Sequence, residues 1–350
     1  MTIIWAGGED LDFECIGGAP VETAYYRSSY ARCALGVPVQ RTATTGMVTY
    51  WNTGNIFALA NFWLSARCAD TSYCSPSNED GNSFLVRWYD AAGLPRLQVS
   101  GIPWGDGNRG NSSLNGFRLQ TLNAAGTVTT IATTTNGFVD NYIAKLDFHI
   151  NYLSSFTMYV DGLAHLTFTG TLATDANTGL GGFSLGQSAQ YGSDLNIGSG
   201  AGGTAYWSEL IIATTDTRSM SLQTLPPTGA GATSAWVGDA NGDTVNLVSF
   251  NDGAGITSAS AGEIELFTQG GTYTAPYIAG IVVSARAMTG SSAPQNMSLL
   301  LNQGGTTYAS PALALGGYFA AYQYVWQSDP STGAPFAVIS SMQTGIESLT

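Results

Sequence analysis

Apolar and polar residues alternate along most of the chain. The alternation is clearest in six segments that are separated by Gly, Asn and Asp: 47–52, 60–68, 83–90, 116–123, 144–152 and 156–162. A period of two places every second side chain on one face, so each segment predicts an antiparallel strand with one buried face. No segment shows a sustained 3.6-residue period, and we expect few and short helices. Many short strands at about ten-residue spacing predict an all-β fold of the sandwich or jelly-roll type.

Three turns between these segments have a specific chemistry. Ala-Ala-Gly occurs at 91–93 and at 124–126, and Asp161-Gly162 follows another strand-like segment. Such sequences suit hairpins whose turn residues need a positive φ. The turns therefore support the prediction of antiparallel neighbours.

A change in the pattern near residue 226 divides the chain. The strand-like segment 206–216 is followed by Pro226, Pro227 and many small residues, which we expect to break regular structure. Ten of the eleven basic residues precede this point, and Arg286 is the only one after it. Strand-like patterns then resume, so we predict two domains. The first is a jelly-roll sandwich over 1–225, and the second is a smaller C-terminal β-sandwich over 226–350.

The charge balance excludes several partners. The chain has 24 acidic and 11 basic residues, a formal net charge of −13, and Lys145 as its only lysine. Nucleic acids and anionic membrane surfaces attract cationic proteins, so we expect no nucleic-acid binding. No apolar stretch reaches the roughly 18 residues of a spanning helix, and we expect no membrane insertion. The N-terminal sequence lacks a basic start before an apolar core, so we expect synthesis in the cytoplasm without a signal peptide.

Few residues are suited to redox or transition-metal chemistry. His149 and His165 are the only histidines, and both lie in strand-like segments rather than in a metal-binding spacing. No nucleophile has a recognisable triad motif around it, so we predict neither an enzyme nor an organic cofactor. Cys68 and Cys74 are close enough in sequence to bridge a small loop, although unbridged thiols are the reading we prefer.

Oxygen-rich turns are the candidates for a structural ion. Asp239, Asn241 and Asp243 alternate like the start of a calcium loop, but the downstream bidentate Glu is missing. The turns at 78–82 and 106–108 have a similar composition. A structural Ca²⁺ at Asp239–Asp243 is one prediction, and Asx-type turn chemistry is the simpler alternative.

A Gly-rich loop carries the predicted glycan site. Trp104 lies there without any alternating pattern, and its polar neighbours are Asp106, Asn108, Arg109 and Asn111. An exposed indole beside such groups would combine sugar stacking with planar hydrogen bonds. The alternative is that the Trp104 ring folds back onto the sandwich.

Three parts of the sequence resemble known families. The segments MTIIWAGGEDLDF and YYRSSYARCAL resemble the opening of a group of tailed-bacteriophage virion proteins. The segment from YWSELIIATTDTRSM to MQTGIES is similar to the second half of those proteins, and FTMYVDG resembles a strand of concanavalin A-like (laminin-G-like) jelly rolls. The resemblance implies a concanavalin A-like jelly roll and a place on a phage particle, in a tail, fibre, collar or head decoration.

One acidic motif resembles an enzyme site. On a strand, the carboxylates of Asp10, Asp12 and Glu14 would share a face. The pattern resembles the Glu-x-Asp-x-Glu strand of laminarinase-type glucanases, whose outer carboxylates act as nucleophile and acid. Asp10 is one methylene shorter than that pattern requires, and the motif lies on the first strand instead of mid-chain. We therefore interpret it as the solvent-facing side of an edge strand.

These observations lead to one expected function and two alternatives. We expect a non-enzymatic structural component of a bacteriophage virion that contacts other virion proteins. Segments 277–283 and 309–326 hold more apolar residues than a small core easily buries, so we expect homo-oligomerisation through residues 226–350. The first alternative is a module that binds a host-surface glycan, and it is compatible with the expected function. The second alternative is a jelly-roll glycoside hydrolase.

Overall fold

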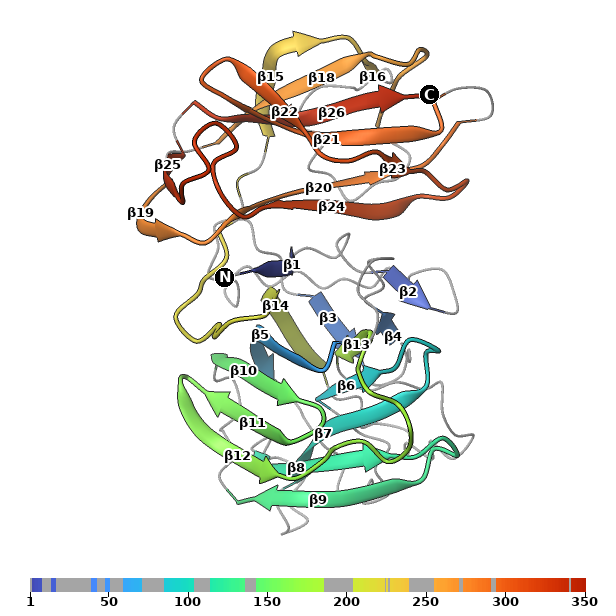
Figure 1. The fold of residues 1–350 in the computed structure, drawn as a ribbon, viewed down its shortest axis with the longest axis vertical. Helices are drawn as coiled ribbons and strands as arrows, with labels where there is room; N and C mark the ends of the chain where they lie inside the picture. Colours follow the sequence, from blue (N-terminus) through green and yellow to red (C-terminus); the bar gives the residue numbers. More distant parts are fainter. Residues whose placement is uncertain are drawn as a thin grey trace. The chain divides into compact units, whose positions relative to one another are not determined.

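The fold is known for the parts of the chain that a computed structural model describes. These are residues 2–7, 14–16, 39–42, 48–50, 59–70, 85–103, 114–135, 143–185, 204–223, 225, 227–238, 255–270, 273–290, 294–339 and 341–350. Their regular structure is entirely β-strand (Figure 1). The all-β prediction is therefore confirmed, with an antiparallel jelly-roll sandwich followed by a smaller β-sandwich. Within the described residues, no helix has the length and hydrophobicity of a membrane span.

The chain forms two compact units. The first comprises residues 6–222, and the second comprises residues 1–5 together with 223–350. The unit of residues 6–222 contains a five-stranded sheet and all of a seven-stranded sheet except the first residues of β1. The seven-stranded sheet has the order β1-β14-β5-β10-β11-β12, with β3 also paired to β14. Its strands are β1 (Ile3–Gly7), β3 (Val39–Thr42), β5 (Asn61–Asp70), β10 (Ile143–Asn151), β11 (Ser155–Val160), β12 (Leu163–Thr169) and β14 (Thr204–Ala213).

The second sheet of this unit has the order β13-β6-β7-β8-β9. Its strands are β6 (Val86–Tyr89), β7 (Pro95–Pro103), β8 (Leu114–Leu122), β9 (Val128–Thr134) and β13 (Gly182–Leu185). A separate short pair consists of β2 (Glu14–Ile16) and β4 (Val48–Tyr50). The registered neighbours in both sheets are antiparallel, as the alternating sequence pattern predicts.

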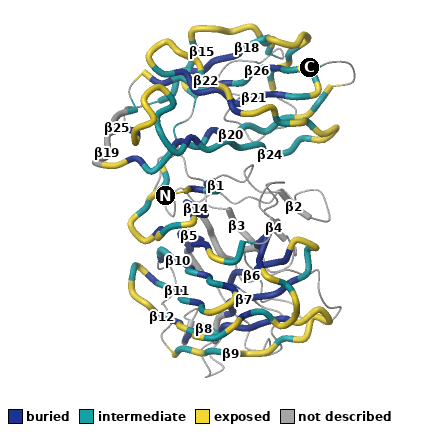
Figure 2. Tube along the Cα trace, viewed as in Figure 1, coloured by how far each residue is buried: buried dark blue, intermediate teal, exposed yellow. Residues whose placement is uncertain are grey.

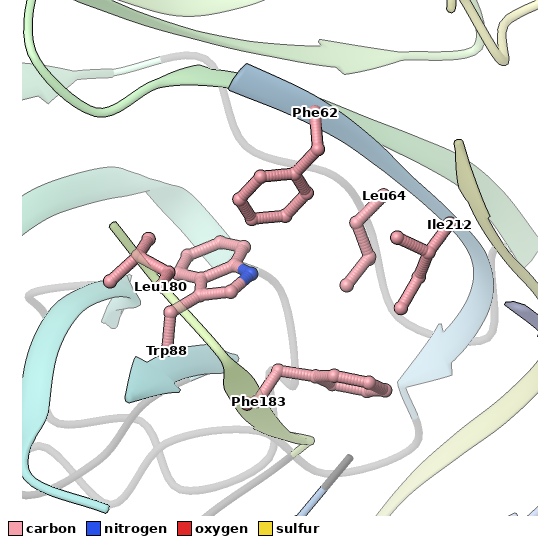
Figure 3. A pocket seen from close by; sticks show the side chains of 7 residues that line it. Phe62, Leu64, Trp88, Leu180, Phe183 and Ile212 are labelled. Atoms are coloured by element: carbon pink, nitrogen blue, oxygen red, sulfur yellow. The ribbon is translucent and has the colours of Figure 1, made fainter. Parts of the chain in front are cut away.

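Aromatic side chains join the two sheets of the first unit. The Trp88 ring from β6 meets the Phe148 ring from β10 edge to face, with 5.4 Å between centroids. Phe62 and Leu64 approach Trp88 from the seven-stranded sheet (Figure 3). The space between these side chains leaves no room for a water molecule, so it belongs to the packed core. Trp88 is 1% exposed, and its Nε1 has no hydrogen-bond partner among the described residues.

The predicted hairpin turns are confirmed by backbone angles. Gly93 and Gly126 have φ values of 78° and 79°. Asp161 and Gly162 both have positive φ, 48° and 83°, in the turn between β11 and β12. Glycine adopts this region without the steric cost of a Cβ atom, which explains its place in each turn.

The second unit is also built from antiparallel strands. Its largest sheet has the order β15-β18-β26-β21-β22, with β23 paired to β21. The strands are β15 (Pro227–Ser234), β18 (Ile264–Gln269), β21 (Asn296–Gln303), β22 (Thr306–Ala309), β23 (Leu313–Ala314) and β26 (Gln343–Leu349). The smaller pairs are β16 (Val237–Gly238) with β17 (Ile256–Thr257), β19 (Tyr273–Ile278) with β25 (Phe336–Ile339), and β20 (Ile281–Ala287) with β24 (Ala320–Trp326).

One apolar core holds the second unit together. Leu299 and Leu301 of β21 are buried in the same cluster as Val283 of β20 and Trp326 of β24. The β20–β24 pair therefore packs against the largest sheet of this unit. The start of the chain belongs to the same unit because the Gln327 side chain pairs with the backbone of Ile3. The Ile3 N–H donates to Gln327 Oε1 at 2.9 Å, and Gln327 Nε2 donates to the Ile3 carbonyl at 2.5 Å.

The expectation that Pro226 and Pro227 break regular structure is wrong for the residues that follow. Strand β15 begins at Pro227 and pairs with β18, although its register shifts twice. Proline is tolerated because β15 is an edge strand and Pro227 is its first residue. Gly231 allows β15 to approach β18 closely, since a Cβ there would lie 2.6 Å from the Leu266 carbonyl carbon.

Candidate functional site

The residues predicted from sequence to bind ligands fall outside the described part of the chain. This holds for the glycan-site residues Trp104, Asp106, Asn108, Arg109 and Asn111, and for the calcium-loop residues Asp239, Asn241 and Asp243. The turn at 78–82 also lies outside it. All of these assignments stay predictions. Within the described residues, no three His, Cys, Asp or Glu side chains are grouped so that they could hold a metal ion.

The acidic motif and the cysteine pair are described only in part. Asp10 and Asp12 lie outside the described residues, and Glu14 begins β2 with its side chain undescribed. Cys68 is buried on β5 with 1% exposure, whereas Cys74 is outside the described residues. The catalytic interpretation of the motif and the pairing of the cysteines are therefore both untested.

A row of polar side chains crosses the five-stranded sheet. Arg87 of β6 is paired with Gln98 of β7, Gln98 with Gln120 of β8, and Gln120 with Thr130 of β9. Because Trp88 points into the core and side chains alternate along a strand, Arg87 and its paired residues lie on the opposite face. We call Arg87, Gln98, Gln120 and Thr130 the polar row, and the face that carries it the outer face of this sheet.

Hydrogen bonds run through the polar row in one direction. Arg87 Nε donates to Gln98 Oε1 at 2.8 Å, and Gln98 Nε2 donates to Gln120 Oε1 at 2.8 Å. Gln120 Nε2 then donates to Thr130 Oγ1 at 3.2 Å. The hydroxyl of Ser100 also donates to Gln120 Oε1 at 2.8 Å. Each amide orientation is thus set by its neighbours, and the last acceptor of the chain is the Thr130 hydroxyl.

Solvent exposure rises from the middle of the polar row to its end. Gln98 is fully buried and Gln120 is 3% exposed, whereas Thr130 is exposed. In Figure 2, β9 is coloured teal and yellow, in contrast to the buried parts of β6 and β7. Arg118 and Thr133 are register partners beside this end; Arg118 is half-buried and Thr133 is exposed. We call Arg118, Thr130 and Thr133 the contact surface.

Arg118 is the cation that this surface offers to a ligand. Within the described residues, its guanidinium takes part in no salt bridge or hydrogen bond. A guanidinium carries five N–H donors in a planar fork, which suits pairs of neighbouring oxygen atoms. The contact surface therefore combines an available cation with two exposed hydroxyl groups.

A second arginine on the outer face is fully engaged. Arg96 forms salt bridges with Asp90 at 2.7 Å and with Asp175 at 2.5 Å, and it is 5% exposed. Asp90 also accepts the backbone N–H groups of Ala92 and Leu94, both at 2.9 Å. These two carboxylates raise the pKa of Arg96 against the opposing effect of its burial. This cluster stabilises the β6–β7 turn, and the Arg96 charge is paired with two carboxylates within it.

Sequence reasoning missed the polar row, although a signal was present. The tripeptide Arg-Leu-Gln occurs at 96–98 on β7 and again at 118–120 on β8. In each copy the leucine faces the core and the two long polar side chains face outward. Long polar residues that repeat at the outward positions of neighbouring strands predict a polar sheet face.

The similarity of this chain to known proteins is limited to the fold. No protein-family model matches the chain, and no curated protein matches it. The endo-β-1,4-glucuronan lyase from the fungus Trichoderma reesei is similar, with a TM-score of 0.41 and 8% identity over 61% of this chain and 96% of that chain. The cellulose-induced protein Cip1 gives a TM-score of 0.33 and 10% identity over 51% and 80% of the two chains.

A third similar structure is a single domain of a larger enzyme. Domain 4 of AbnA, a GH43 extracellular arabinanase from Geobacillus stearothermophilus, was solved in complex with arabinotriose. Its TM-score is 0.29, with 16% identity over 60% of this chain and 81% of that chain. Scores and identities at this level carry no argument about what the present chain binds.

Proposed function

We propose that the chain is a non-enzymatic β-sandwich protein that binds glycans through the contact surface of Arg118, Thr130 and Thr133. The observation that carries this proposal is the one-directional hydrogen-bond chain that ends at an exposed hydroxyl beside an unengaged guanidinium. The buried part of the polar row orients the Thr130 hydroxyl before any ligand arrives. Such preorganisation lowers the entropy cost of binding.

The chemistry of the contact surface suits sugar hydroxyl groups. Thr130 Oγ1 already accepts a hydrogen bond from Gln120, so its own proton is free to be donated outward. Arg118 can donate two N–H groups to a pair of adjacent sugar oxygens. Thr133 adds a second exposed hydroxyl beside Arg118 in the register. A glycan would meet donors and acceptors on the outward side of β8 and β9.

A binding experiment with matched variants tests this proposal. The wild-type protein is screened on a glycan array, and the best ligand is then titrated calorimetrically. We expect Arg118→Gln and Thr130→Ala each to weaken binding about tenfold, the effect of losing one or two hydrogen bonds. Thr129→Ala is the control because Thr129 is also exposed on β9 but pairs with Thr121, on the opposite face. Equal affinity of all four proteins, or no binding by wild type, would contradict the proposal.

We further propose that this glycan-binding protein is a virion component made in the host cytoplasm. The resemblance of its two ends to tailed-phage proteins supports this assignment. In the described part of residues 226–350, Tyr318 is 88%, Tyr277 is 55% and Met288 is 43% exposed. Large exposed apolar side chains favour contacts with another protein, either a second copy or a virion partner.

Light scattering tests the self-association part of this proposal. We expect the full-length protein to be oligomeric and the Tyr318→Ser variant to dissociate more readily. A control variant, Leu163→Ser, removes another highly exposed apolar side chain (71%) from the other unit and should leave the assembly intact. A monomeric wild type that also fails to bind particles lacking it would overturn the assignment.

We also propose that the protein has no catalytic activity and that it binds a structural calcium ion. Each of these two proposals has its own test. Purified protein is expected not to hydrolyse glucans, and a hydrolysis that Glu14→Gln abolished would show that the acidic motif is catalytic. For the ion, thermal unfolding is compared with added Ca²⁺ and with chelator. A raised melting temperature that Asp243→Asn removes would support the calcium loop at Asp239–Asp243, and unchanged melting would contradict it.

A further inference from the structure

The outer face of the seven-stranded sheet holds the segment that leads out of the first unit. This connecting segment, residues 214–222, follows β14 and ends where the unit ends. Lys145 of β10 points toward it, because its neighbours Ala144 and Leu146 are buried in the core. Its ammonium donates to the carbonyls of Thr217 at 2.8 Å, Arg218 at 2.9 Å and Met220 at 2.5 Å.

This contact uses the whole hydrogen-bonding capacity of the lysine. An ammonium group has three donors, and here each has a carbonyl acceptor from the same turn. The turn is also closed by the Met220 N–H, which donates to the Thr217 carbonyl at 2.8 Å. Lys145 is the only lysine of the chain, so no other lysine can take its place.

A buried carboxylate holds the same turn from a second side. The Thr217 hydroxyl donates to Asp147 Oδ1 at 2.8 Å, and both residues are fully buried. Asp147 also lies 3.9 Å from the Lys145 ammonium. Burial lowers the pKa of Lys145, and the nearby Asp147 carboxylate opposes that effect. The charge of each group is thus compensated within the contact.

Arg218 attaches the connecting segment to two aromatic side chains on the sheet, Tyr159 and Trp63. Its guanidinium carbon lies 4.5 Å from the centroid of Tyr159 and 5.6 Å from that of Trp63. The Trp63 ring is in turn stacked on His149, with centroids 4.4 Å apart and an interplanar angle of 10°. Asp216 pairs with Arg218 at 2.5 Å, so its guanidinium is held by a carboxylate as well as by the rings.

We propose that Lys145 and Arg218 form a latch that fastens the connecting segment to the sandwich and sets the point where the chain leaves it. While the latch is closed, the connection to the second unit starts at residue 223. If it opens, the nine residues 214–222 are released from the outer face of the seven-stranded sheet. The latch is therefore a conformational device that controls whether the connecting segment is bound to the sandwich, and it is independent of glycan binding.

Limited trypsin digestion of the full-length protein tests the latch. The Arg218 side chain is 40% exposed, but the carbonyl of the Arg218–Ser219 bond is one of the three groups bound by Lys145. Cleavage there requires the segment to open, and its rate follows the open population. We expect the 219–350 fragment to appear about tenfold faster in Lys145→Met, which loses three charge-assisted hydrogen bonds. The control Arg118→Met changes a cation on the other sheet and should be cleaved like wild type.

Two outcomes would overturn the proposal. One is an unchanged rate of cleavage after Arg218 in a folded Lys145→Met protein. The other comes from hydrogen exchange of the wild type, which needs no variant to fold. A closed latch protects the Met220 amide as strongly as the neighbouring strand amides of β10, whereas rapid exchange at Met220 would show that the turn is open. Thr217→Val, which removes the bond to Asp147, should raise both the cleavage rate and the Met220 exchange rate.

Discussion

The two outer faces of the sandwich use their cations in different ways. On the seven-stranded sheet, Lys145 is bound by three backbone carbonyls and Arg218 is held by Asp216 and two rings. On the five-stranded sheet, Arg87 starts a hydrogen-bond chain and Arg118 has no partner among the described residues. A cation whose donors are all satisfied by its own chain stabilises structure. A cation without a partner among the described residues is available to a ligand.

This difference matters because the chain has so few positive charges. Eleven basic residues are spread over 350, and ten of them precede residue 226. Arg118 is a half-buried arginine without a partner among the described residues, and in an acidic protein such a cation is a candidate for ligand binding. We therefore propose that ligand binding takes place on the five-stranded sheet and that the seven-stranded sheet fastens the connecting segment.

The largest expected effect on stability concerns Arg96, the arginine of the five-stranded sheet that is paired with two carboxylates. Arg96→Met leaves Asp90 buried without its counter-ion, and we expect the free energy of unfolding to fall by about 3–5 kcal/mol. Arg218→Met is the comparison on the other sheet. Its partner Asp216 is exposed, so the loss should be about 1 kcal/mol or less. Urea unfolding measures both, and equal losses would remove the distinction between a buried and an exposed pair.

A smaller loss is expected when the polar row is interrupted. Gln120→Met keeps the volume of the side chain but removes the acceptor for Gln98 and Ser100 and the donor for Thr130. Leaving buried donors unpaired costs about 1–3 kcal/mol. We also expect weaker glycan binding, because Thr130 loses the bond that orients its hydroxyl. Unchanged stability in urea unfolding together with unchanged affinity would show that the row does not organise the contact surface.

A pH effect distinguishes the seven-stranded sheet. Burial lowers the pKa of His149, Arg218 lowers it further, and Asp216 opposes both. The unfolded chain therefore binds a proton more readily than the native protein as the pH falls below about 6.5, so the native state loses stability there. We expect a smaller loss in His149→Asn, measured by urea unfolding between pH 7 and pH 5. Parallel slopes for the wild type and His149→Asn would contradict the prediction.

The smallest effect on stability is expected at Arg118 itself. Because it is half-buried and has no partner among the described residues, Arg118→Gln should change the free energy of unfolding by less than about 0.5 kcal/mol. The same variant should lose glycan affinity. A marked destabilisation in urea unfolding would show that Arg118 is structural and that the two outer faces are alike.

Much of the fold follows from local sequence, because alternation and turn chemistry act over a few residues. The predicted segments 60–68 and 144–152 match β5 and β10 closely, and the glycines at 93, 126 and 162 have the expected positive φ. Strand β15 was missed because its pairing depends on an edge position that a single segment does not reveal.

The candidate site was harder to predict because it depends on register. Arg87 and Thr130 are distant in sequence, and only the pairing of four strands brings them into one row. The Lys145 contact likewise requires carbonyls from residues 217–220, whose positions a strand pattern cannot supply. The repeated Arg-Leu-Gln tripeptide is the local feature that points to the polar face.

The most direct test of the central claim is a hydrogen-exchange footprint of the intact protein with and without a bound glycan. The account predicts that the ligand slows exchange in β8 and β9, around Arg118 and Thr130, and leaves β10 and β11 unchanged. Slower exchange on β10 and β11 with no change on β8 and β9 would place binding on the other outer face and contradict the assignment.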